Sequence, residues 1–98
     1  MDKKDLVRMA KAGEAGAFAR LYEEIYKDLY RFALYALGTV QDAEDAVSEA
    51  VIDGFAGIAG LRNEDAFRGW MFRILSVKCR QRLKQLLHQL FFLPAKRA

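Results

Sequence analysis

The stretch "DAEDAVSEAVIDGF", residues 42–55, repeats small apolar residues at steps of three and four, the spacing of one face of an α-helix. That apolar face consists of Ala43, Ala46, Val47, Ala50, Val51 and Phe55. By the same spacing, a second face consists of Asp45, Ser48, Glu49 and Ile52. The stretch therefore predicts a helix that begins near Thr39–Asp42, ends near Phe55–Ile58, and buries its small residues while it exposes acids.

Two further helical stretches precede this one. The longer, residues 15–37, repeats apolar residues at helical spacing and is followed by Gly38, a residue type that often ends helices. Its apolar positions are Phe18, Leu21, Tyr22, Ile25, Leu29, Phe32, Ala33, Ala36 and Leu37. A short stretch, residues 3–12, ends before Gly13. We predict an α-helix for each.

A last helix is predicted after the loop "GIAGLRN", residues 57–63. Asn63 is a good N-cap residue, and the acids at the next two positions suit the positive end of a helix dipole. We expect this helix to reach about Phe92, because Pro94 is the next helix breaker. Since no two-residue alternation typical of a strand appears, the predicted fold is all-α: a small bundle of three to four helices with a long C-terminal helix.

The bulk composition limits the class of protein. The chain has 98 residues, enough for one small domain, and its 53% hydrophobic and 30% charged residues exclude a disordered or collagen-like chain. No apolar run approaches the roughly 18 residues of a membrane span, and the first residues lack the apolar segment of a secretory signal. With Cys79 as the single cysteine, we expect a cytoplasmic protein with no membrane partner.

The sequence has no arrangement of residues typical of an enzyme. Cys79 and His88 each occur once and have no activating neighbour in the sequence, so we expect structural roles for both. Neither a glycine-rich phosphate loop nor the spacing of a metal site is present. We therefore expect no catalysis, no metal and no cofactor.

Charge is divided unevenly along the chain. Residues 1–61 hold seven basic and eleven acidic side chains, whereas residues 62–98 hold nine basic and two acidic ones. Such asymmetry between two parts of one chain suggests two different partners. The basic part is suited to a nucleic acid, and the plainer interpretation, a solvated surface, stays open.

Three segments together resemble region 2 of bacterial sigma factors of the extracytoplasmic-function group. "AFARLYEEIYKDLYRFALYALG" (17–38) resembles the start of that region, and "DAEDAVSEAVIDGF" (42–55) resembles its Asp-Ala-Glu-Asp helix. "FRGWMFRILSVKCRQRLK" (67–84) resembles its Trp-Leu-x-x-Ile-Ala helix. The resemblance covers about residues 3–84 and implies a transcription initiation factor.

The resemblance also implies two partners, the β′ subunit of the RNA polymerase core and promoter DNA. In the family the acidic helix docks on the β′ clamp helices, while the last helix and the loop before it face the −10 element, whose non-template strand inserts a flipped base into that loop. We accordingly predict that polymerase is bound by Asp45, Ser48, Glu49 and Ile52. We predict that DNA is bound by Arg62, Asn63, Arg73, Lys78, Arg80 and Lys84.

Plainer interpretations stand beside these assignments. An acidic helix face is usually only solvated, and scattered cations usually serve solubility and salt bridges. Asn63 is also a simple N-cap. Phe67 and Trp70 have the spacing of core residues, although aromatic residues can stack on bases.

Several positions depart from the family pattern. Ser48 replaces a glutamine on the docking face, and Val77 replaces an asparagine in the helix that reads the −10 element. Gln81 and Lys84 replace an aspartate and an arginine. Because valine makes no hydrogen bond to a base edge, an alternative function stays open: a sigma-like interaction module, dimeric or regulatory, without specific promoter reading.

The C-terminal end of the sequence raises a separate question. We divide the chain into a region 2-like domain, residues 1–84, and an apolar helical extension with a basic tail, residues 85–98. The sequence leaves no room for the helix-turn-helix of region 4, so it is either a fragment or a region 2-only protein that works with a separate region 4 protein or an anti-sigma factor. Leu87, Leu90 and Phe91 are the predicted contacts of a partner or of a homodimer.

Overall fold

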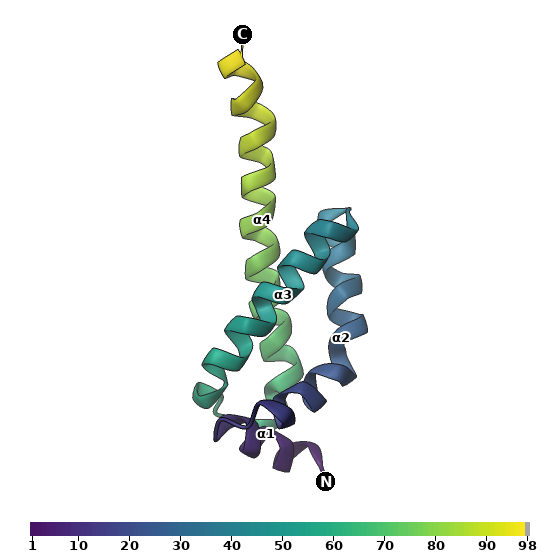
Figure 1. Ribbon diagram of the computed structural model, residues 1–98, viewed down its shortest axis with the longest axis vertical. Coiled ribbons are helices and arrows are strands. Elements are labelled where there is room, and N and C mark those ends of the chain that lie inside the picture. Colours follow the sequence, from purple (N-terminus) through teal and green to yellow (C-terminus); the bar gives the residue numbers. More distant parts are fainter. Residues whose placement is uncertain (98) are drawn as a thin grey trace.

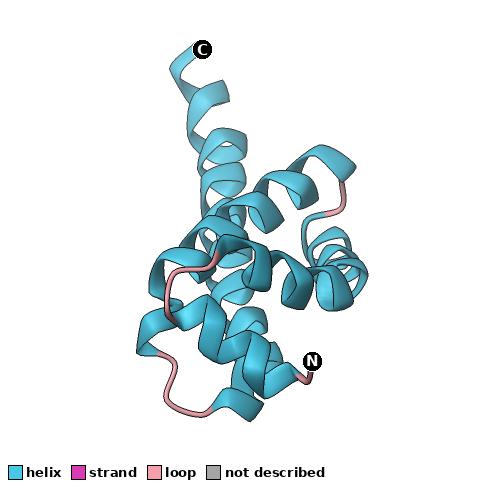
Figure 2. Cartoon of the chain, turned by 60° about the horizontal axis from the view of Figure 1, so that its bottom comes forward, coloured by secondary structure: helices cyan, strands magenta, loops and turns pink. Residues whose placement is uncertain are grey.

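The computed structural model describes the backbone of residues 1–97 and the side chains of residues 1–91. This part of the chain forms four α-helices joined by short turns, and it contains no strand (Figures 1 and 2). The helices are α1 (Lys3–Lys11), α2 (Ala15–Leu37), α3 (Val40–Gly57) and α4 (Phe67–Arg97). Two 3-10 turns, η1 (Ile58–Gly60) and η2 (Glu64–Ala66), connect α3 to α4. The predicted all-α fold with a long C-terminal helix is confirmed.

Local hydrogen bonds define where α2 ends and α3 begins. Gly38 has φ 86°, a left-handed conformation that suits glycine, and its N–H donates to the Leu34 carbonyl at 2.8 Å. One residue later, the Thr39 hydroxyl accepts from the Asp42 N–H at 3.2 Å. These caps turn the chain sharply, so α3 folds back beside α2.

The last helix differs from its predicted bounds at both ends. The Asn63 carboxamide accepts from the Asp65 N–H at 2.9 Å, but it caps the 3-10 turn η2, and α4 itself begins at Phe67. A tight 3-10 turn is common at the start of a helix. At the other end, the predicted stop near Phe92 is wrong, because the backbone stays helical through Pro94 to Arg97. A proline removes one helical hydrogen bond, and here the helix continues past it.

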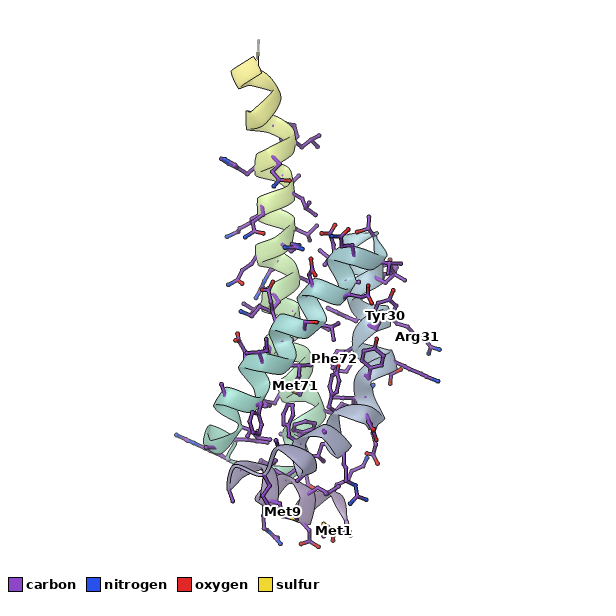
Figure 3. All side chains as sticks on the ribbon, viewed as in Figure 1. Met1, Met9, Tyr30, Arg31, Met71 and Phe72 are labelled. Atoms are coloured by element: carbon purple, nitrogen blue, oxygen red, sulfur yellow. The ribbon has the colours of Figure 1, made fainter. Side chains whose placement is uncertain are left out.

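The core lies where α3 packs against both α2 and α4. The buried side of α3 is built from small residues, namely Ala43, Ala46, Val47, Ala50 and Gly54. Leu29 of α2 and Met71 and Leu75 of α4 are fully buried against this surface. Met71, labelled in Figure 3, lies between α3 and α4. Small side chains on α3 therefore let the larger ones of its neighbours fill the interior.

Two aromatic residues expected inside lie closer to the surface. Phe55 was predicted on the buried side of α3, yet it is 36% exposed and packs its ring on that of Phe18, with centroids 5.3 Å apart. Gly54 takes the buried position instead. Phe32 is likewise 40% exposed and rests edge-on against Phe72. Each lies at the edge of the apolar face of its own helix, beyond the part of that face that the neighbouring helices cover.

Phe67, Trp70 and Cys79 have the packing roles that the sequence predicted. Phe67 and Cys79 are buried in the core, and Trp70 is half-buried against it. The folded chain measures 59 × 22 × 19 Å, and its length comes from α4, which continues well beyond the other helices (Figure 1).

Replacing Gly54 by leucine is predicted to destabilise the fold. A Cβ at this position would lie 2.6 Å from the Met71 sulfur and 3.4 Å from the Phe18 ring. Because Met71 is fully buried, the added volume has nowhere to go, and we expect the free energy of unfolding to fall by about 1–3 kcal/mol. Urea unfolding followed by circular dichroism measures the change.

Gly69→Leu is the matched control, since Gly69 lies in α4 with nothing within 4 Å of its would-be Cβ. This variant should gain up to about 1 kcal/mol from helix propensity. Equal stability of the two variants would show that α3 and α4 do not pack closely at Gly54.

Candidate functional site

The outer face of α3 carries the four residues predicted to bind polymerase. Asp45, Ser48, Glu49 and Ile52 lie on the same side of the helix, away from the core. Ser48 and Glu49 are exposed, Ile52 is 67% exposed, and the Asp45 side chain is 48% exposed. The structure therefore brings this set together as one surface of mixed acidic and apolar character.

Glu44 belongs to the same surface and was missed from the sequence. It is exposed, lies one helical turn before Ser48, and forms no ion pair among the described residues. The signal that could have found it is the four-residue step from Glu44 to Ser48 and on to Ile52. From here on, "outer face of α3" means Glu44, Asp45, Ser48, Glu49 and Ile52.

An apolar groove adjoins this surface at the C-terminal end of α3. It is lined by Ala15, Phe18, Val51, Ile52, Phe55 and Ala56. Ile52 belongs both to the groove and to the outer face, so the acids and the groove form one continuous area. The sequence could not indicate the groove, because Ala15 and Phe18 come from α2 and reach it only through tertiary packing.

Ion pairs join the side of α3 that faces α4 to that helix. The Arg82 guanidinium contacts Asp42 at 3.1 Å and also contacts Asp45. The Lys78 ammonium contacts Asp53 at 2.7 Å. The Arg82 and Lys78 side chains are 25% and 19% exposed, so both lie in the junction between the helices. Acids and cations on these facing sides thus neutralise each other.

The titration behaviour of two groups in α4 follows from this packing. The hydrogen bond to Asp53 raises the pKa of Lys78, with help from the charges of Asp53 and Glu49, against an opposing effect of desolvation. Lys78 therefore stays protonated at neutral pH. Burial raises the pKa of the Cys79 thiol, which stays neutral and unreactive.

A different side of α4 carries cations that point into solvent. Arg73, Val77, Arg80 and Lys84 follow one another at steps of four, three and four, which places them on one side of the helix. All four are exposed, and Arg73, Arg80 and Lys84 form no ion pair with any residue whose side chain is described. We call these four residues the basic face of α4.

The predicted DNA-binding residues therefore do not form one cluster. Lys78 is directed toward α3, while Arg73, Arg80 and Lys84 lie on the basic face. Arg62 is exposed in the loop before α4, and Asn63 beside it is occupied as an N-cap. Because a helix rises about 1.5 Å per residue, Lys84 lies about 26 Å along α4 from Phe67. Arg73, Arg80 and Lys84 therefore form a line along α4, and Lys78 does not belong to it.

Val77 interrupts the cations of the basic face. It is 37% exposed, and Arg80, Gln81 and Lys84 join it in lining a shallow hollow. The hollow has cations at its edges and no hydrogen-bonding group at Val77. The geometry suits a phosphate backbone better than the edge of a base.

Residues predicted to contact a partner near the C-terminus are exposed on α4. Leu87, Leu90 and Phe91 are 52%, 64% and 68% exposed. In the described part of the chain, no three His, Cys, Asp or Glu side chains gather as metal ligands would. None of the described helices combines the length and the hydropathy that a membrane crossing requires.

Comparison with known proteins identifies the family of the chain. The family model of sigma-70 region 2 matches residues 21–87. ECF RNA polymerase sigma factor SigM of Mycobacterium tuberculosis is 30% identical over 81 residues, which cover 83% of this chain and 41% of SigM. No solved structure gives a significant match.

Two further relatives are similar over the same region. ECF RNA polymerase sigma factor SigW of Bacillus subtilis is 35% identical over 72 residues, covering 72% of this chain and 38% of SigW. BldN of Streptomyces coelicolor, of the same description, is 35% identical over 71 residues, covering 71% of this chain and 27% of BldN. This chain thus spans well under half the length of these relatives. On the match over residues 21–87 and the all-helical fold, the chain belongs to the sigma-70 region 2 family, in its extracytoplasmic-function group.

Proposed function

We propose that this domain serves in transcription initiation, docking on the β′ clamp helices of RNA polymerase through the outer face of α3 and holding the −10 region of promoter DNA along α4. One observation carries the proposal: α3 keeps exposed acids, and α4 keeps exposed cations, that form no ion pair with any described side chain. Family membership supports the same division of roles.

The outer face of α3 has the composition of a docking surface. An exposed isoleucine beside an apolar groove offers contact area, and the surrounding carboxylates offer attraction to a basic partner. Glu44 has no ion pair in the described structure, so its charge remains available, and Glu49 is exposed without an ion pair although it lies near Lys78. A clamp helix with basic and apolar side chains would fit this surface.

The basic face of α4 is suited to the nucleic-acid backbone. The chain has no acid after Asp65, so nothing on α4 itself repels phosphates. Arg73, Arg80 and Lys84 are spread along the helix and would contact successive phosphates of an unpaired strand. Such contacts position the domain on DNA without reading its sequence.

The alternative function, an interaction domain without promoter preference, is favoured by Val77. Its exposed side chain stands in the middle of the basic face and makes no base-specific hydrogen bond. The two functions differ in whether a −10 sequence binds better than a scrambled one.

Glu49→Lys is predicted to weaken binding to a purified β′ clamp fragment by at least about tenfold, because it replaces attraction by repulsion on the outer face of α3. Fluorescence anisotropy with a labelled clamp fragment measures the affinity. Glu23→Lys makes the same change of charge on an exposed position of α2 and should leave the affinity within about twofold. Equal losses in both variants, or no binding by the unaltered chain, would remove the docking proposal.

Arg82→Gln is predicted to strengthen clamp binding by up to about fivefold. Arg82 forms an ion pair with Asp45, and a partially exposed pair of this kind is worth up to about 1 kcal/mol. A basic partner that binds Asp45 must break this pair, and the variant removes that cost. Anisotropy again measures the effect, with unfolding curves to confirm that the variant is folded. Unchanged or weaker binding would show that Asp45 takes no part in docking.

Replacing Arg73, Arg80 and Lys84 together by glutamine is predicted to flatten the salt dependence of binding to a −10 non-template single strand. Each phosphate contact on single-stranded DNA contributes about 0.7 to the slope of log affinity against log salt, so three contacts account for about 2. The titration is carried out with the chain bound to the clamp fragment.

Arg20, Lys27 and Arg31 of α2 provide the control, since they are exposed and Arg31 points away from the bundle (Figure 3). Their replacement by glutamine removes the same charge and should change the slope by less than about 0.7. A similar loss of slope in both triple variants would show that net charge, and not the basic face of α4, attracts the strand. Equal affinity for −10 and scrambled strands would favour the alternative function.

A further inference from the structure

The distal part of α4 carries apolar side chains that no other helix covers. Figure 3 shows this part of the helix standing clear of the bundle, with side chains on it and no neighbouring element. Leu83, Leu87, Leu90 and Phe91 are 37%, 52%, 64% and 68% exposed, and Leu86 is half-buried. We call these five residues the distal stripe.

The distal stripe continues the buried side of α4. Leu75 and Cys79, 0% and 3% exposed, face the core, and steps of four, three and four lead from Cys79 to Leu83, Leu86 and Leu90. Within the bundle this side is covered by other helices. Beyond the end of the bundle, the same side of α4 is exposed, although its residues are still as apolar as those of a buried surface. An exposed apolar patch of this kind indicates an interaction surface.

The surroundings of the distal stripe are entirely basic or neutral. By helical spacing, Arg80 and Lys84 flank the edge formed by Leu87 and Phe91, and neither cation has an ion pair among the described side chains. No acid occurs anywhere in residues 66–98. An occupant of this surface would therefore meet positive charge that no described side chain neutralises, on two cations that also belong to the basic face of α4.

A second copy of α4 fits this surface poorly. Two distal stripes in contact would bring cations together in either orientation, since α4 contributes no acid. Charge therefore favours a different partner.

We propose that the distal stripe, with Arg80 and Lys84 beside it, binds an acidic amphipathic helix of another protein. Such a helix would present apolar residues at steps of three and four to the stripe, and Asp or Glu at its edges to the two cations. This contact is separate from the outer face of α3 and does not depend on polymerase docking. Of the two occupants that the sequence leaves open, a partner and a second copy, the proposal takes the partner.

The probe is a labelled synthetic peptide of about four heptads with leucine at its apolar positions and glutamate at its flanking positions. Two companion peptides have lysine in place of glutamate, or the same composition in an order that destroys the apolar face. Fluorescence anisotropy against the whole chain should show saturable binding of the acidic amphipathic peptide alone. No binding, or equal binding of the scrambled peptide, would overturn the proposal.

Matched variants test the location of the contact. Leu87→Glu with Leu90→Glu should weaken peptide binding by at least about tenfold, because it places charge within the stripe. Gln85→Glu with Gln89→Glu adds the same charge on the opposite side of α4 and should change the affinity by less than about threefold. All four residues are exposed, so neither variant disturbs the core, and circular dichroism confirms that helicity is retained.

Two outcomes of these measurements would contradict the proposal. Equal weakening by both double variants would mean that the peptide responds to net charge only. Sedimentation velocity over a concentration series should show a monomer. A dimer that Leu87→Glu with Leu90→Glu dissolves would make a second copy the occupant of the distal stripe.

Discussion

The close packing of α3 on α4 determines where the charged sides of these two helices point. Gly54 and the alanines of α3 bring the helix near Met71 and Leu75, and a larger residue at Gly54 would overlap the Met71 side chain. Once these sides face each other, the remaining sides of both helices are directed outward. The outer face of α3 and the basic face of α4 are thus separate consequences of one apolar contact.

The same contact also determines which charges remain available to partners. Asp42, Asp53, Lys78 and Arg82 lie where the two helices meet and pair with one another across the junction. Glu44 on one helix, and Arg73, Arg80 and Lys84 on the other, form no such pair, and Glu49 lies beside Lys78 and Arg82 at the junction without an ion pair of its own. Pairing at the junction therefore leaves two outward surfaces of opposite sign, although the chain as a whole is close to neutral with a net charge of +3.

Periodicity predicted the helices well, and it predicted their contacts less well. The bounds of α2, Ala15–Leu37, agree with the prediction because an uninterrupted apolar face ends at a left-handed glycine. Lys78 and Arg80, by contrast, are two residues apart in one basic segment, and only the position of α3 shows that Lys78 is paired. The apolar groove was not predictable for the same reason, because it joins residues of α2 and α3. Spacing shows which residues share a side of a helix, and tertiary packing decides what that side meets.

The distal part of α4 consists mostly of good helix formers, but it lacks the tertiary packing that stabilises the rest of the helix. Arg80 and Lys84 are like charges four residues apart, an arrangement that destabilises a helix by about 0.2–0.5 kcal/mol. Short helical segments without tertiary packing are also marginal in water. Besides its own composition, this segment is stabilised because it continues a helix whose first turns are fixed by Phe67, Met71 and Leu75 in the core. A partner that brings carboxylates to the cations and apolar side chains to the stripe would remove both sources of instability, so binding there and helix formation should favour each other.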